Sequence, residues 1–223
     1  MSGRPGLVVR TPGIEYTRAW AIQRRLADAR RAGTVPDVIW LLEHPPVFTT
    51  GRHGRREDLA LDDAALDARG ATFHTIDRGG QMTWHGPGQT TGYVIADLRG
   101  GRGVRAFVGA LVAAMADAAA VPGAAPGADD TGLYRGGRKL GSVGVRIAQG
   151  VSTHGVGLNR DPDLGWFDLC IPCGAPDVPA TSIAAEGGDP DRSRVEADLA
   201  DALAQRLGLA LTTASLEDLL RGH

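Results

Sequence analysis

The sequence predicts one α/β (α+β) domain in which helices flank a mixed β-sheet. The first observation is length, because 223 residues suit a single domain with a sizeable core. The second is that helical and strand-like segments interleave along the chain. The third is that this interleaving lacks the regular strand-helix-strand rhythm of doubly wound and barrel folds, which favours a mixed sheet.

The N-terminal part predicts a strand, a helix and a buried strand. Leu7 to Val9 is a short apolar run, and Tyr16 to Arg31 carries apolar side chains at helical spacing until Gly33 ends the pattern. The continuous apolar run Val38 to Leu42 is typical of a strand buried on both faces. We therefore expect this strand to lie centrally in the sheet.

A short helix and two more strands are expected next. Asp62 or Asp63 can cap a helix that Gly70 closes, and Ala71 to Ile76 and Tyr93 to Leu98 have the composition of strands. Because the segment between these two strands is rich in glycine, we expect a loop there.

The following segment predicts a helix and a β-hairpin. Val104 to Ala120 has the apolar spacing of an amphipathic helix, and an exposed connection follows to residue 130. Leu140 to Ile147 and Val151 to Leu158 indicate two strands, which Gln149 and Gly150 can join in a tight turn.

The C-terminal segment contains one more helical pattern, from Val195 to Leu207. We expect residues 195–223 to form a helical cap on a single domain that spans residues 1–223. The chain shows no internal repeat that would indicate a second domain.

Composition predicts a cytoplasmic protein without nucleic-acid or membrane partners. Lys and Arg number 24 and Asp and Glu 26, so the formal charge of −2 gives no general attraction to nucleic acid or to a membrane surface. No apolar run approaches the ~20 residues that span a bilayer, and residues 1–12 lack the apolar core of a signal peptide. The two cysteines, Cys170 and Cys173, are expected to be reduced.

The segment from Arg78 to Gln89 is the densest candidate for a binding site. Five glycines lie between positions 79 and 92, and backbone without Cβ atoms can approach a ligand closely. Arg78 and His85 supply polar groups, and Trp84 can wall an apolar channel. An isolated Gly-rich loop is more often a surface connection, but these neighbours favour binding. The segment matches neither of the common nucleotide-binding glycine patterns.

Lys139 stands at the start of an expected strand, beside small residues. A lysine at that place is normally a solvated surface charge. If the strand points it into a pocket, its side chain can favour a nearby thiolate and relay protons. Ser142, Val143 and Gly144 follow on the same strand and can line the same groove.

Cys170 and Cys173 form a C-x-x-C pair, so redox and zinc roles must be weighed. Gly174 and Pro176 interrupt the helix that a thioredoxin-like pair should open, and the chain lacks the second pair of ligands that a zinc site needs. Cys170 follows Leu169 in an apolar context, which favours buried packing. For Cys173, between a rigid proline and a permissive glycine, a nucleophilic and a structural role fit the local sequence equally well.

His154 is a further polar candidate, within the segment Thr153 to Asn159. Small residues at a strand end can let a substrate chain pass close to the backbone, and His154 can orient a polar group. A histidine in a strand is nevertheless more often a structural residue.

Four segments, in this order, resemble the octanoyltransferases, also called the lipoate–protein ligase B family. They are Asp77 to Gln89, Arg138 to Arg146, Thr153 to Asn159, and Pro172 to Gly174 followed by Thr181 and Ser182. The resemblance covers most of the chain. It implies the fold of the biotin and lipoate protein ligase catalytic domains.

The same resemblance implies an acyl-accepting cysteine at Cys173, a lysine that tunes it at Lys139, and a substrate groove. Trp84 stands where the family usually has tyrosine, and Leu133 with Tyr134 where it usually has valine and tryptophan, so chain-length preference stays open. The expected groove residues are Arg78, Gly79, Gly80, Gln81, Met82, Thr83, Trp84, His85, Ser142, Val143, Gly144, Gly155, Val156 and Gly157.

The activity that the resemblance implies is transfer of an octanoyl group from octanoyl-acyl carrier protein to a lysine of apo lipoyl domains, through a thioester on Cys173. The implied acceptors are the 2-oxoacid dehydrogenase complexes and the glycine cleavage H protein. Exchange of one thioester for another changes the free energy little, and conversion of a thioester to an amide lowers the free energy. We therefore expect no ATP, no cofactor and no metal.

Three other functions fit parts of the sequence. An ATP-dependent lipoate or biotin ligase of the same fold would activate a free acid and would not need Cys173. A catalytically silent acyl-binding or regulatory protein would use the fold only as a pocket. A redox protein would use Cys170 together with Cys173.

A basic cluster at Arg52, His53, Arg55 and Arg56 is a candidate docking face for the carrier. Acyl carrier proteins are acidic, so a basic surface can attract them. A merely solvated loop is an equal alternative for this cluster.

Overall fold

The computed structural model describes residues 3–101, 103–128, 131–170 and 178–221. The strands are β1 (Arg4–Gly13), β2 (Asp37–Glu43), β3 (Val47–Thr50), β4 (Thr72–Thr75), β5 (Met82–His85), β6 (Gln89–Ile95), β7 (Ala125–Pro126), β8 (Gly132–Arg135), β9 (Arg138–Ala148), β10 (Val151–Asn159) and β11 (Leu209–Thr213). The helices are α1 (Tyr16–Ala32), α2 (Asp63–Asp67), α3 (Val104–Ala119), α4 (Arg192–Leu207) and α5 (Leu216–Arg221), with short 3-10 helices at η1 (Arg56–Asp58) and η2 (Leu164–Leu169).

These strands form two sheets. The large sheet has the order β11-β1-β2-β6-β10-β9-β8-β7, and the small sheet has the order β4-β3-β5. In the large sheet β11, β1 and β2 run parallel, and every further neighbour is antiparallel. The predicted mixed sheet with flanking helices is therefore confirmed.

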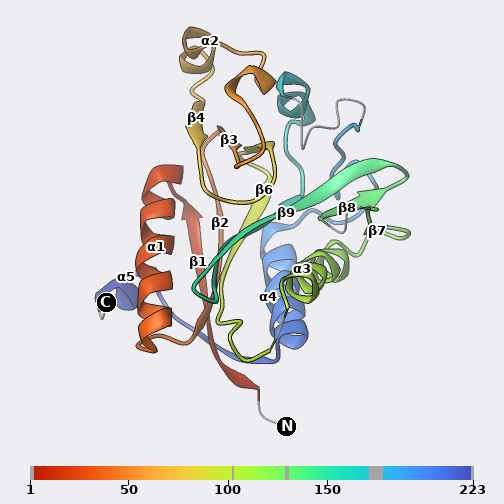
Figure 1. The fold of residues 1–223 in the computed structure, drawn as a ribbon. Coiled ribbons are helices and arrows are strands. Elements are labelled where there is room, and N and C mark those ends of the chain that lie inside the picture. Colours follow the sequence, from red (N-terminus) through yellow and green to blue (C-terminus); the bar gives the residue numbers. More distant parts are fainter. Residues whose placement is uncertain (1–2, 102, 129–130, 171–177, 222–223) are drawn as a thin grey trace.

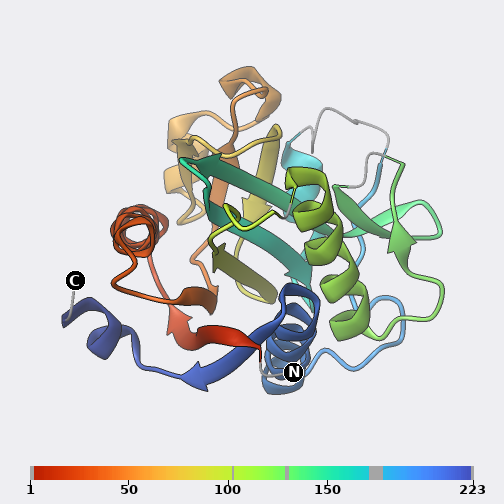
Figure 2. The same cartoon turned by 60° about the horizontal axis from the view of Figure 1, so that its bottom comes forward.

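The helices cover the large sheet on both faces, and the small sheet stands beyond one end of it (Figure 1). α1 lies on one face, whereas α3 and α4 lie side by side on the other, which Figure 2 shows after a rotation. No helix within the described ranges is long and apolar enough to cross a membrane.

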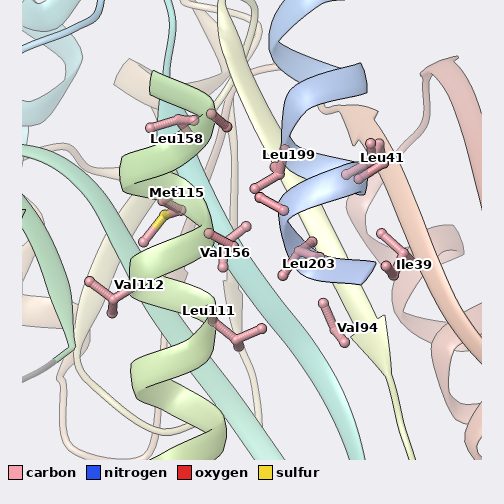
Figure 3. Packing of buried hydrophobic residues seen from close by; sticks show 14 of the residues in the cluster. Ile39, Leu41, Val94, Leu111, Val112, Met115, Val156, Leu158, Leu199 and Leu203 are labelled. Atoms are coloured by element: carbon pink, nitrogen blue, oxygen red, sulfur yellow. The ribbon is translucent and has the colours of Figure 1, made fainter. Parts of the chain in front are cut away.

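The apolar run in β2 is buried on both faces, as its sequence predicts. Ile39 and Leu41 pack toward α3 and α4, where Leu111 and Leu199 meet them in one core (Figure 3). Trp40, between them, faces the opposite core beneath α1. Because strand side chains alternate between faces, this single strand contributes to both cores.

The helix boundaries follow local signals. Gly33 ends α1 with a positive φ of 77°, and its N–H donates to carbonyls of the last turn. Asp62 caps α2 by accepting a 2.8 Å hydrogen bond from the Ala65 N–H. Gln149 and Gly150 both have positive φ, so the predicted turn between β9 and β10 matches a two-residue hairpin.

Two segments differ from the expected pattern. The stretch from Met82 to His85, expected within a loop, forms β5, which pairs with β3. The C-terminal residues expected to form a helical cap also contain β11, which extends the large sheet beside β1, and α4 packs into the main core.

Candidate active site

A cavity of about 400 Å3 is lined by residues of both sheets and of the loop between β4 and β5. The floor includes the small residues Ser142, Gly144, Gly155 and Gly157 of the neighbouring strands β9 and β10, which pair in register. The other lining residues are Tyr16, His53, Arg78, Gly79, Gly80, Gln81, Thr83, His85, Thr91, Tyr93, Val108, Thr131, Val143, Val145, His154 and Val156.

The expected groove residues line this cavity with two exceptions, Met82 and Trp84. In β5 the side chains of Thr83 and His85 face the cavity, so the alternating Met82 and Trp84 face the other side. There Trp84 is 1% exposed and stacks on Trp166 with ring centroids 5.6 Å apart. Trp84, expected to wall an apolar channel, therefore packs in a core beside this cavity and does not line it.

Glycines on the floor allow other chain segments to lie against it. A Cβ atom at Gly144 would lie 2.9 Å from Cδ of Arg78, and one at Gly155 would overlap the carbonyl oxygen of Gly92 on β6. Any larger residue at either position would push the neighbouring segment away.

Arg78 is a buried cation that holds the loop over the floor. Its guanidinium donates to the Thr49 carbonyl at 2.8 Å and to the Thr49 hydroxyl at 2.9 Å. The N–H of Gly79 donates to the Val145 carbonyl at 2.9 Å, which ties the same loop to β9. The loop is thus fixed to both sheets.

Lys139 lines a second, smaller cavity of about 20 Å3 that adjoins the first. The two cavities share Thr83, Ser142 and Gly157. The Lys139 ammonium lies 5.6 Å from the centroid of the Tyr134 ring, a cation–π contact. Lys139, expected either on the surface or in a pocket, therefore lies in a pocket.

Cys173, the expected nucleophile, lies outside the described residues. The chain before that segment contributes Phe167 to the small cavity, and the chain after it contributes Val178 and Ala180. The Lys139 N–H donates to the Pro179 carbonyl at 2.8 Å. Described residues on both sides of Cys173 in the sequence therefore lie beside Lys139.

Cys170 is a packing residue, as its sequence context predicts. Its side chain is 7% exposed, within a core that also contains Trp84 and Phe167. The Cys170 sulfur lies 3.7 Å from the Phe167 carbonyl oxygen. Cys170 lines neither of the two cavities.

Comparison with known proteins assigns the family. Residues 15–205 match the lipoyl protein ligase A/B catalytic domain. An octanoyltransferase of Alcanivorax borkumensis is 41% identical over 93% of this chain and 82% of its own length. An octanoyltransferase of Solibacter usitatus is 43% identical over 78% of this chain and 80% of its own length. The chain belongs to the octanoyltransferase family.

Comparison with solved structures shows which fold this octanoyltransferase family member has. A lipoate-protein ligase A bound with ATP superposes with a TM-score of 0.75 at 14% identity, covering 99% of this chain and 93% of that one. A biotin protein ligase from Aquifex aeolicus in complex with biotin and ATP superposes with a TM-score of 0.53 at 13% identity, and the match covers 91% of this chain and 70% of that one. The expected biotin and lipoate ligase fold is therefore confirmed.

His154 of this octanoyltransferase family member is held by a carboxylate. The His154 Nε2–H donates to Asp77 Oδ1 at 2.9 Å, and Trp20 Nε1–H donates to the same oxygen at 3.2 Å. This hydrogen bond from His154 lowers the Asp77 pKa, while burial lowers the pKa of His154. His154 is therefore a neutral imidazole beside an ionised carboxylate. Its backbone has a positive φ of 61°, unusual within a strand.

Sequence reasoning missed a chain of hydrogen bonds at the cavity, which runs from Tyr93 through His44 to the Ile14 carbonyl. His44 Nδ1 lies 2.6 Å from the Ile14 carbonyl oxygen, so Nδ1 carries the proton. Burial lowers the His44 pKa to about 4, so its Nε2 accepts from the Tyr93 hydroxyl at 2.6 Å. The sequence offered one signal for this chain of hydrogen bonds, because the hydroxyl group of a buried tyrosine needs a hydrogen-bond partner.

No group of three or more His, Cys, Asp or Glu side chains in the described ranges is arranged to hold a metal ion.

Proposed function

We propose that this protein transfers an octanoyl group from octanoyl-acyl carrier protein to a lysine of a lipoyl domain, with Cys173 and Lys139 as catalytic residues. The observation that supports this most is that two neighbouring cavities share the lining residues Thr83, Ser142 and Gly157. One can enclose an acyl chain, and the other contains Lys139. The names of the relatives support the octanoyl group as the one transferred.

In the first step Lys139 accepts the thiol proton of Cys173, and the thiolate attacks the thioester carbonyl carbon of the donor. The new C–S bond forms while the bond to the phosphopantetheine sulfur of the carrier breaks. Lys139 then returns the proton to the departing thiolate. Backbone N–H groups near Gly144 or Cys173 are candidates to stabilise the oxyanion.

In the second step the acceptor lysine amine attacks the acyl thioester on Cys173. The amide bond forms, the bond to the Cys173 sulfur breaks, and Lys139 accepts the proton that the amine loses. The proposed acceptors are lipoyl domains of 2-oxoacid dehydrogenase complexes and the glycine cleavage H protein. A mitochondrial octanoyltransferase of Arabidopsis thaliana, 35% identical over 78% of this chain and 75% of its own length, likewise supports the octanoyl group as the one transferred.

The basic cluster is a proposed docking face for the carrier. Arg52 and His53 are exposed, and His53 also lines the large cavity. Arg56 is partly engaged within the fold, because it pairs with Asp63 at 3.0 Å and lies 4.8 Å from the Phe73 ring centroid. Arg52, His53 and Arg55, which are all exposed, are therefore the better placed part of this face.

The test is intact-mass measurement after incubation with octanoyl-acyl carrier protein in the absence of an acceptor. We expect one octanoyl adduct that hydroxylamine removes. Cys173→Ser should abolish the adduct, whereas the matched variant Cys170→Ala should retain it, because Cys170 is buried away from the cavity. Absence of a labile adduct on the unmodified chain under turnover conditions would overturn the proposal.

The rival ligase activity needs a separate measurement. Exchange of labelled pyrophosphate into ATP with free lipoate or biotin would indicate an adenylate-forming enzyme. We expect no exchange, and transfer that proceeds without ATP.

A further inference from the structure

Three residues border both the large cavity and the small one, and we call them the boundary residues. They are Thr83 of β5, Ser142 of β9 and Gly157 of β10. Ser142 and Gly157 are direct partners in the ladder between their strands. Thr83 alternates along β5 with Met82 and Trp84, which lie in the core on the other side, so its side chain faces the cavities.

In the proposed function the thioester carbonyl of the donor lies at this boundary. Lys139, which exchanges protons with the reacting sulfur, lines the small cavity, and at about 20 Å3 this cavity has room for about one water-sized group. The acyl chain therefore needs the large cavity of about 400 Å3. Because the carbonyl carbon joins the sulfur to the chain, a sulfur beside Lys139 and a chain in the large cavity place this carbon beside the boundary residues.

The amide side chains that line the small cavity are bound to the fold. Gln89 donates from its amide nitrogen to Asn159 Oδ1 at 2.9 Å and to the Trp84 carbonyl at 3.2 Å. The Gln89 oxygen, 2.7 Å from His85 Nδ1, must then accept, so Nδ1 carries the proton. Asn159 donates from Nδ2 to the Thr181 carbonyl at 2.9 Å. These hydrogen bonds hold both amides in place.

The hydroxyl groups of the boundary differ from these amides. Neither the Thr83 nor the Ser142 hydroxyl makes a hydrogen bond to another residue in the part of the chain that the structure describes. Both residues are half-buried, one in the small sheet and one in the large sheet. A hydroxyl has one proton to donate, and rotation about its C–O bond can direct this proton. The boundary thus carries two hydrogen-bond donors that the fold does not use.

We propose that the Thr83 and Ser142 hydroxyls are catalytic groups that donate hydrogen bonds to the thioester carbonyl oxygen. The inference rests on the proposed function, because it concerns the same acyl transfer. When the thiolate or the acceptor amine attacks the carbonyl carbon, the π electrons of the C=O bond move onto the oxygen. The two hydroxyls stabilise this negative charge and keep their protons. When the bond to the leaving sulfur breaks, the electron pair returns and the carbonyl forms again.

The test is steady-state and single-turnover measurement of octanoyl transfer from acyl carrier protein. Thr83→Val keeps the shape of the side chain but removes the hydroxyl, so we expect kcat to fall about 10²-fold with little change in KM. Thr83→Ser restores the hydroxyl and should retain most of the rate. Ser142→Ala should lower kcat in the same direction as Thr83→Val, and it provides a second test if that variant does not fold.

Thr75→Val is the matched control. Thr75 is exposed on β4 of the same small sheet and lines neither cavity, so this variant should leave kcat and KM unchanged. The melting temperature of every variant shows whether a loss of rate reflects a loss of fold.

The possible failures are distinguishable. If the unmodified enzyme transfers octanoyl but Thr83→Val and Ser142→Ala keep kcat, or raise only KM, the catalytic role of the hydroxyls is refuted. A loss of rate in Thr83→Ser as large as that in Thr83→Val would also refute it, since the hydroxyl is then present. If the unmodified enzyme transfers no octanoyl group from the carrier, the proposed function itself is refuted.

Discussion

Mild acid should destabilise this protein, because two buried histidines stay neutral only in the folded state. Burial lowers the pKa of His44 to about 4 and that of His85 to about 3, from an ordinary value of 6.5. As a neutral group, His44 donates one hydrogen bond and accepts another, and neutral His85 donates one from Nδ1 to Gln89. Protonation would place a charge where the fold provides only neutral partners.

The size of the effect follows from proton linkage. Well above pH 6.5 neither the folded nor the unfolded chain protonates these rings, so they add no pH dependence. Below pH 6.5 the unfolded chain binds the protons first, and the free energy of unfolding falls until pH drops below the folded values. When the pH falls from 7.5 to 5.0, each ring lowers the free energy of unfolding by about 2 kcal/mol, and the pair lowers it by about 4 kcal/mol. His74 and His154 have lowered pKa values and act in the same direction.

The assay is urea unfolding at 25 °C, followed by tryptophan fluorescence, at pH 7.5 and 5.0. His44→Gln keeps a donor for the Ile14 carbonyl and an acceptor for the Tyr93 hydroxyl but cannot titrate. We therefore expect this variant to lose about 2 kcal/mol less over the same pH interval. A free energy of unfolding that is equal at both pH values, or a pH dependence that His44→Gln leaves intact, would refute the reasoning.

Two further predictions follow from the packing and from the surface. Gly155→Ala would place Cβ against the Gly92 carbonyl oxygen and should lower the free energy of unfolding by roughly 2 kcal/mol, because β6 and β10 must separate. The control is Gly100→Ala, since no atom lies within 4 Å of its new Cβ. Equal melting temperatures for the two variants would contradict this account. Charge reversal at Arg52 and Arg55 should raise KM for the carrier-bound acyl group and spare a small acyl thioester, whereas equal effects on both substrates would exclude the docking face.

Local sequence patterns predicted most elements because their causes are local. The apolar run Val38 to Leu42 required burial on both faces, and Gly33 supplied the positive φ at which α1 ends. The small sheet was not anticipated. Its strand β5 carries Trp84 and His85 inside a glycine-rich stretch, and its pairing with β3 depends on residues more than 30 positions away, 47 to 50 against 82 to 85.

The candidate site was predicted as a set of segments but not as a cavity. Residues of the predicted groove segments line one cavity, yet the alternation along β5 turns Trp84 away from it. Tyr16 and Tyr93 were expected to serve only as parts of a helix and a strand. Their contribution to the cavity depends on where α1 and β6 meet, which no short sequence pattern encodes.

By itself, the sequence determined the family resemblance, the order of the groove segments and the burial of Cys170, because these depend on residue types and on local spacing. Only the tertiary structure decided that Lys139 lies in a small cavity adjoining a larger one, and that the two cavities share Thr83, Ser142 and Gly157. Those features arise from the register in which β6, β10 and β9 pair and from the small sheet that lies against them. Register is set by contacts across the whole fold, and it brings Ser142 and Gly144 of β9 beside Gly155 and Gly157 of β10 at the cavity.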